Sequence, residues 1–175
     1  MLRLLTVLFI LLLPVPAAPA AAANARFLEA VITYDHGQYD TALRAFRRLA
    51  RRGHDGAEFM LGAMYFYGKG VPRNDRFAAI WFHKAAIQGH PGSQLAFGSL
   101  HIRGIGVQQN LAEAYKWLTI AADRGVPGLR QQAILLRDEA ARLMQPDEIA
   151  AAERAAHRFT PTRAGLVTES ALANE

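Results

Sequence analysis

The 175-residue chain contains no cysteine. Disulfide bridges, cysteine-ligated zinc sites, a cysteine nucleophile and a lipid-modified cysteine anchor are therefore excluded. Because no covalent cross-link is available, the fold has to be stabilised by packing alone.

Residues that could form a reaction centre are scarce. Ser93 is interpreted as a helix N-cap, and Ser99 as a position of the repeat described below, so neither is a candidate nucleophile. His54 and His90 recur 36 residues apart, which indicates a structural role. No histidine has a carboxylate at metal-ligand spacing on a shared helix face. The sequence therefore predicts no enzyme, no cofactor and no metal ion.

The formal net charge is +5, and part of the positive charge gathers in one predicted patch. That patch consists of Arg47, Arg48, Arg51 and Arg52. It could attract an anionic surface or nucleic acid, but a solvated helix face is the simpler interpretation. We therefore do not expect a nucleic-acid partner.

The chain does contain an internal repeat with a period of 36 residues, over residues 56–91 and 92–128. A repeat of this length is typical of a solenoid, whose units bury their apolar faces only against neighbouring units. Identical residues recur at the pairs Gly62/Gly98, Gly68/Gly104, Gly70/Gly106, Val71/Val107, Asn74/Asn110, Ala78/Ala114, Trp81/Trp117, Ala85/Ala121, Ala86/Ala122 and Gly89/Gly125.

Each repeat predicts a helix, a loop and a second helix. In the first repeat, the helices are expected over about residues 57–66 and 75–88. The second helix places alanines and aromatic residues on one face, at Ala78, Trp81, Phe82, Ala85 and Ala86. Small and large residues alternate there, so we expect neighbouring helices to approach closely around a buried tryptophan.

Glycine and asparagine mark the loop between the two helices. Gly68 follows the first helix where a left-handed residue is expected, and Gly70 allows a second such backbone angle. Gly68 and Gly70 lack the third glycine and the preceding strand of a phosphate-binding loop. Asn74 stands where an N-cap side chain accepts hydrogen bonds from the second helix. We therefore expect the same loop geometry in both repeats.

Residues 24–55 and 129–159 predict capping units at the two ends of the array. The first contains a turn of tetratricopeptide type from Gly37 to Ala42 and lacks the long glycine loop. The second also lacks that loop, and Pro146 begins its last helix. Residues 160–175 show little periodicity and predict a flexible tail.

Residues 1–23 predict a secretory signal peptide. Arg3 precedes an apolar run, prolines and alanines follow, and cleavage is expected after Ala20 or Ala23. The alternative is a transmembrane anchor, which the prolines disfavour because they interrupt a spanning helix. We therefore expect an exported, periplasmic protein, with inner-membrane anchoring or secretion as alternatives.

The first repeat carries the pattern Leu61-Gly62-x-x-Tyr65-x-x-Gly68-x-Gly70-Val71, Ala78-x-x-Trp81 and Lys84-Ala85-Ala86-x-Gln88-Gly89. This pattern resembles the Sel1-like repeat, a relative of the tetratricopeptide repeat. The resemblance implies an all-α fold, a right-handed α-solenoid of stacked helix-loop-helix repeats. It also implies a non-catalytic adaptor or scaffold of the bacterial cell envelope. The alternatives are a cell-wall or polysaccharide-binding module and a hydrolase related to cysteine-rich repeat proteins linked to penicillin binding.

The first helices of such arrays line the concave face, which is the usual binding surface. On the register that Gly62 sets, the candidate partner-binding residues are Tyr34, Phe66, Tyr67, Ser99 and Arg103. Aromatic residues and arginine are favoured at interfaces. We expect a protein or peptide partner, membrane contact only through a retained signal, and a monomer or weak homo-oligomer.

Overall fold

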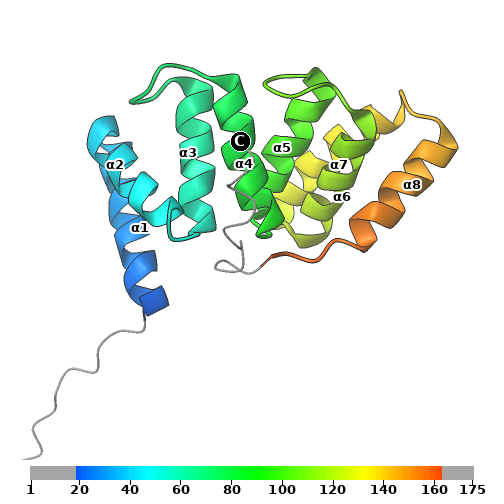
Figure 1. Ribbon diagram of the computed structural model, residues 1–175. Helices are drawn as coiled ribbons and strands as arrows, with labels where there is room; N and C mark the ends of the chain where they lie inside the picture. Colours follow the sequence, from blue (N-terminus) through cyan, green and yellow to red (C-terminus); the bar gives the residue numbers. More distant parts are fainter. Residues whose placement is uncertain (1–18, 163–175) are drawn as a thin grey trace, which may run out of the picture.

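The computed structural model describes residues 19–162, and the statements below concern that range. It contains eight α-helices and no strand there. Their bounds are α1 Pro19–Asp35, α2 Tyr39–Ala50, α3 Asp55–Tyr67, α4 Asp75–Ile87, α5 Pro91–Arg103, α6 Leu111–Arg124, α7 Pro127–Ala141 and α8 Pro146–His157. Helices α1 to α6 follow one another along the array, and α7 and α8 both pack on α6 (Figure 1), which confirms an all-α solenoid.

Most of the predicted signal peptide, residues 1–18, lies outside the described range. Its last five residues, Pro19 to Ala23, form the first turns of α1. Within residues 19–162, no helix combines the length and the apolarity that a membrane crossing requires.

The loops of the two repeats have the same backbone, as expected. Gly68 and Gly104 end α3 and α5 in the left-handed conformation, with φ values of 68° and 66°. The side-chain oxygens of Asn74 and Asn110 each accept a hydrogen bond of 3.0 Å from the third residue beyond them. These caps satisfy amides that the first turns of α4 and α6 would otherwise leave unpaired.

A glycine in each first helix lets the paired helix approach closely. A Cβ atom at Gly62 of α3 would lie 2.6 Å from the Phe82 ring of α4. A Cβ atom at Gly98 of α5 would lie 2.8 Å from Leu118 of α6. Because the two contacts occur at equivalent positions, the glycines set the same helix spacing in both repeats.

The apolar face of α4 is buried at Ala78, Phe82, Ala85 and Ala86. The tryptophans of the two repeats differ: Trp117 is 3% exposed, whereas Trp81 is only half-buried. The expected burial of the tryptophan in the core is therefore found at Trp117 and only in part at Trp81. The physical reason is that Phe159, beyond α8, lies against Trp117 with 5.2 Å between ring centres.

The beginning of the predicted flexible tail is held against the array. The amide of Thr162 donates a hydrogen bond of 2.9 Å to the carbonyl oxygen of Ile87, at the end of α4. The ring of Pro161 lies 3.2 Å from the position that a Cβ atom of Gly89 would occupy. The tail expectation therefore does not apply to residues 160–162, and residues 163–175 lie outside the described range.

Histidine side chains cap the first helices of both repeats. The Nδ1 atom of His54 accepts from the amide of Ala57 at 3.3 Å, and that of His90 accepts from the amide of Ser93 at 3.1 Å. Ser93 is therefore a residue of the first turn of α5, and its interpretation as the N-cap was wrong. The recurrence of the two histidines has the structural role that their spacing indicated.

Candidate functional site

Two of the expected partner-binding residues are exposed, Arg103 and Tyr67, and Tyr67 is the last residue of α3. Its side chain is 67% exposed, and its ring meets that of Phe66 edge-on with 5.1 Å between centres. Phe66 is half-buried, and the guanidinium of Arg73 lies 5.6 Å from its ring centre. An exposed tyrosine beside a supporting ring offers contact area without a large entropy cost of ordering.

Tyr34 of α1 lies close to this pair. Its ring meets that of Tyr39 edge-on, with 5.1 Å between centres. Burial raises the pKa of Tyr34, and Tyr39, Asp35 and Tyr67 raise it further. The structure therefore brings together rings from α1, α2 and α3, and we call Tyr34, Tyr39, Phe66 and Tyr67 the Tyr67 cluster.

Positive charge borders the Tyr67 cluster. The ammonium of Lys69 lies 5.3 Å from the ring centre of Tyr39. The guanidinium of Arg73 donates to both carboxylate oxygens of Asp75, at 2.8 and 3.0 Å, which raises the pKa of Arg73 and lowers that of Asp75. Because Arg73 is already paired, Lys69 is the cation at this edge that is better placed to meet an acidic group of a partner.

Ser99 and Arg103 belong to α5, one repeat away from the Tyr67 cluster. The hydroxyl of Ser99 donates a hydrogen bond of 2.7 Å to the carbonyl of Ala96, so it is already used within its own helix. Arg103 is exposed at the end of α5, at the position that Tyr67 holds in α3. Within residues 19–162, Arg103 makes no ion pair. The five candidates thus come from successive repeats, with Arg103 on the helix of the second repeat that corresponds to α3.

Sequence reasoning missed Tyr39 and Lys69 as members of this surface. A Cβ atom at Gly70 would lie 2.8 Å from the Cβ atom of Tyr39, so the glycine loop of the first repeat folds over the preceding helix pair. Gly70, the second glycine of the loop, indicated that the backbone approaches another part of the chain closely. The sequence did not indicate that this part is Tyr39.

The predicted basic patch on α2 is divided in the structure. Arg48 and Arg52 line a cleft of about 360 Å³ between α1 and α2, together with Arg26 and Glu29. Arg47 points to the other side, where its guanidinium donates a hydrogen bond of 3.0 Å to the hydroxyl of Tyr65 in α3. The positive charge that the sequence predicts as one patch is therefore divided between two separate surfaces.

Among the carboxyls of residues 19–162, Glu58 of α3 has the pKa that departs most from its ordinary value. It is 5% exposed, and burial raises its pKa to about 7, although Lys84 and a hydrogen bond from Gln88 oppose the shift. The Gln88 amide donates at 2.6 Å. Glu58 does not line the cleft between α1 and α2, and the contacts around it belong to the packing of α3 against α4. Over the described residues, no group of three or more potential metal ligands is placed to hold an ion.

Comparison with protein families identifies Sel1 repeats at residues 56–90 and 93–126. These ranges agree with the two repeats read from the sequence. The exopolysaccharide production negative regulator of Rhizobium meliloti (strain 1021) is 45% identical over 42 residues, which cover 24% of this chain and 16% of that protein. The similarity to the regulator therefore concerns a short part of a longer protein.

Two solved structures have similar folds. A protective antigen with an SLR fold, present in uropathogenic Escherichia coli strains, matches with a TM-score of 0.72 and 25% identity over 81% of this chain. A Sel1 repeat protein from Oxalobacter formigenes matches with a TM-score of 0.56 and 25% identity, over 80% of this chain and 69% of that one. This chain spans only 30% of the antigen.

The repeat ranges, the paired helices with their glycine loops and the two structural neighbours agree with one another. The chain is a Sel1-like repeat protein.

Proposed function

We propose that this protein is a non-catalytic scaffold of the bacterial cell envelope that binds a partner protein or peptide on the face formed by its first helices. Sel1 repeat proteins generally mediate protein–protein interactions. The Tyr67 cluster supports this role, because a tyrosine with 67% of its surface exposed beside other rings has the composition of an interface centre.

The chemistry of this surface favours a partner segment with an apolar or aromatic side chain near a carboxylate. The rings of Tyr67 and Phe66 would contact the apolar group. Lys69 lies beside the cluster, and Arg103 lies one repeat away, so either cation could pair with an acidic group. The formal net charge of +5 also favours an acidic partner during encounter.

We further propose that the protein acts outside the cytoplasm, in the periplasm. The sequence pattern of residues 1–23 supports export. Cleavage after either Ala20 or Ala23 would leave Phe27 and Ala30 in the chain, and through these residues α1 packs on the core that it shares with α2 and α3. Both processing sites are therefore compatible with the α1–α2 pair.

The experiment that tests the partner surface is a binding measurement on a double variant, Tyr67→Ala/Arg103→Ala. The partner is first identified by crosslinking in the cell envelope and mass spectrometry, and its affinity is then measured with purified proteins. We expect at least about 30-fold weaker binding, since removing one central interface residue typically costs about 2 kcal/mol or more.

The matched control is Arg154→Ala, which removes an exposed arginine from α8 at the other end of the array. This control should bind as the wild type does. Unchanged affinity of the Tyr67→Ala/Arg103→Ala variant, with intact helical circular dichroism, would contradict the proposed surface.

A further inference from the structure

The tryptophans of the two repeats occupy equivalent positions, but only one of them is covered by a ring from the end of the chain. Trp117 of α6 is 3% exposed and packs edge-on against Phe159. Trp81 of α4 is half-buried, and the ammonium of Lys84 lies 4.9 Å from its ring centre. Within residues 19–162, no aromatic ring pairs with Trp81 in the way that Phe159 pairs with Trp117.

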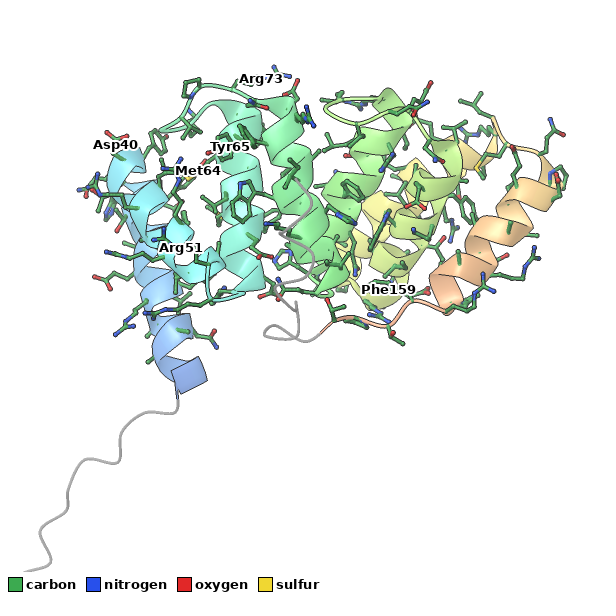
Figure 2. All side chains as sticks on the ribbon, viewed as in Figure 1. Asp40, Arg51, Met64, Tyr65, Arg73 and Phe159 are labelled. Carbon is green, nitrogen blue, oxygen red and sulfur yellow. The ribbon has the colours of Figure 1, made fainter. Side chains whose placement is uncertain are left out.

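The chain beyond α8 reaches Trp117 through several directed contacts. The guanidinium of Arg124 lies 5.2 Å from the ring centre of Phe159 and donates to its carbonyl oxygen at 3.3 Å. Further on, the amide and the hydroxyl of Thr162 donate to the carbonyl of Ile87, at 2.9 and 3.2 Å. The segment leaves α8, passes α6 and reaches the end of α4, so it runs back along the array toward the first repeat. Figure 2 labels Phe159 where the chain leaves α8.

The first repeat exposes apolar side chains where the second repeat has charged ones. Phe77 is 49% exposed and Ile80 is 41% exposed. Their counterparts 36 residues later are Glu113 and Lys116, which form an ion pair of 2.6 Å. At these positions the second repeat thus presents charged side chains to solvent, whereas the first repeat presents apolar ones. Neighbouring exposed apolar residues of this kind indicate a surface that is covered by something else.

We define the Trp81 face as Tyr65, Phe77, Ile80 and Trp81. Tyr65 lies against Phe77 with 5.4 Å between ring centres and is labelled on α3 in Figure 2. At the start of α4, a hollow of about 490 Å³ is lined by Asn74, Arg76, Phe77 and Ile80. The face therefore continues from a ring system into a shallow depression.

Positive groups border the Trp81 face. Arg47 donates to the hydroxyl of Tyr65, Lys84 lies over Trp81, and Arg76 lines the hollow. An occupant that fits this face combines apolar anchors with acidic residues. Residues 163–175 have this composition, since they contain Leu166, Val167 and Leu172 together with Glu169 and Glu175, and a single positive residue, Arg163.

Residues 163–175 are long enough to reach the Trp81 face from Thr162. Trp81 precedes Ile87 by six residues of α4, which is about 9 Å along a helix. The thirteen residues from 163 to 175 could span roughly 40 Å if fully extended. The segment is therefore long enough to reach both Trp81 and the hollow at Phe77 within its own chain.

We propose that residues 163–175 dock on the Trp81 face of their own chain, with Leu166 and Val167 as apolar anchors, as Phe159 docks on Trp117. The docked segment would run from α8 past α6 to α4. It would thereby connect the last helix pair with the first repeat. This site is separate from the proposed partner surface at Tyr67, and its test does not depend on an identified partner.

The test is fluorine NMR of the full chain labelled with 5-fluorotryptophan, which gives one resonance for each of the two tryptophans. Trp81→Phe and Trp117→Phe assign the resonances. In Leu166→Asp/Val167→Asp, we expect the Trp81 resonance to shift and its solvent-isotope effect to increase, because water replaces the anchors. The Trp117 resonance should stay in place, since Phe159 remains docked.

The matched control is Thr168→Asp/Ser170→Asp, which adds the same charge and keeps the anchors, so its Trp81 resonance should stay near that of the wild type. Removal of residues 163–175 should reproduce the effect of Leu166→Asp/Val167→Asp. An unchanged Trp81 resonance in both the anchor variant and the truncated chain would overturn the proposal, and so would equal shifts of both tryptophans. A wild-type Trp81 resonance that changes on dilution would also overturn it, because a second copy would then supply the segment.

Discussion

At the scale of single residues, the repeat depends on positions where only glycine fits. Gly106, in the loop of the second repeat, has a φ of 68° and lies against the backbone of α4, where a Cβ atom would clash with the carbonyl of Asp75. Gly37 has a similar φ of 76°, but nothing lies within 4 Å of a Cβ atom there. A substitution at Gly37 therefore introduces backbone strain alone, whereas a substitution at Gly106 introduces both backbone strain and a steric clash.

We expect Gly37→Ala to lower the free energy of unfolding by about 1 kcal/mol, the usual cost of a left-handed residue with a side chain. Gly106→Ala should cost roughly 3 kcal/mol or more, because the loop also has to move away from α4. Urea denaturation followed by circular dichroism measures both values. Equal costs for the two variants would show that the loop does not pack on α4 as described.

Glu58 predicts a pH dependence of stability. Because burial raises its pKa to about 7 in the folded protein, above the ordinary value of 4.5, the folded state binds the proton more tightly than the unfolded state. The stabilising contribution is complete below the unfolded pKa and is lost as the pH rises through the folded value. The next repeat has Gln94 at this position, fully buried, with its amide donating to the carbonyl of Ala86 at 3.1 Å.

Glu58→Gln should therefore stabilise the protein relative to the wild type at high pH. We expect a gain of roughly 2 kcal/mol in the free energy of unfolding at about pH 8 and little gain at about pH 4. Glu139→Gln, at an exposed position of α7, is the control and should change little. A gain that does not depend on pH would contradict the raised pKa of Glu58.

At the scale of helices, the segment after α8 acts as part of the last capping unit. Phe159 packs against Trp117, and Ala156 belongs to the same core cluster. The carboxylate of Glu113 accepts from the indole of Trp117 at 3.0 Å, so the tryptophan is held from two sides. This helix pair and its extension cover the core that the second repeat would otherwise expose.

We expect Phe159→Ala to destabilise the protein by about 2 kcal/mol, less than the usual cost of a fully buried phenylalanine, because Phe159 is half-buried. The fluorescence of Trp117, measured in a Trp81→Phe background, should shift to the red as water reaches its ring. Thr160→Ala removes an exposed neighbour and should leave both properties unchanged.

Helices and loops were largely predictable, because they follow local rules. The positions of Gly68, Gly70 and Asn74 indicated the loop and the cap of α4, and the structure confirms them. The cap of α5 was not predicted, because a serine is the commoner capping residue and Ser93 lies nearby. Pro91 instead occupies the first turn, where no amide donor is needed, and His90 supplies the acceptor.

At the scale of the whole molecule, the 36-residue period was sufficient to predict a solenoid, since each unit packs mainly on its neighbours. The period could not predict contacts between segments that do not repeat. Phe159 at Trp117 and the loop of Gly70 at Tyr39 both bring together parts of the chain with no shared pattern. The register of Gly62 therefore predicted the binding residues only as members of one concave face. The structure shows that Tyr34, Phe66 and Tyr67 lie close together, whereas Ser99 and Arg103 belong to α5 of the next repeat.

The most direct test of the scaffold role is photocrosslinking in cells with benzoylphenylalanine at position 67, compared with the same probe at position 154 of α8. We predict a discrete crosslinked protein at position 67 only, and its loss when Arg103→Ala is added. Equal labelling from both positions, or a product that persists at full strength in the Arg103→Ala variant, would contradict a partner surface along the first helices.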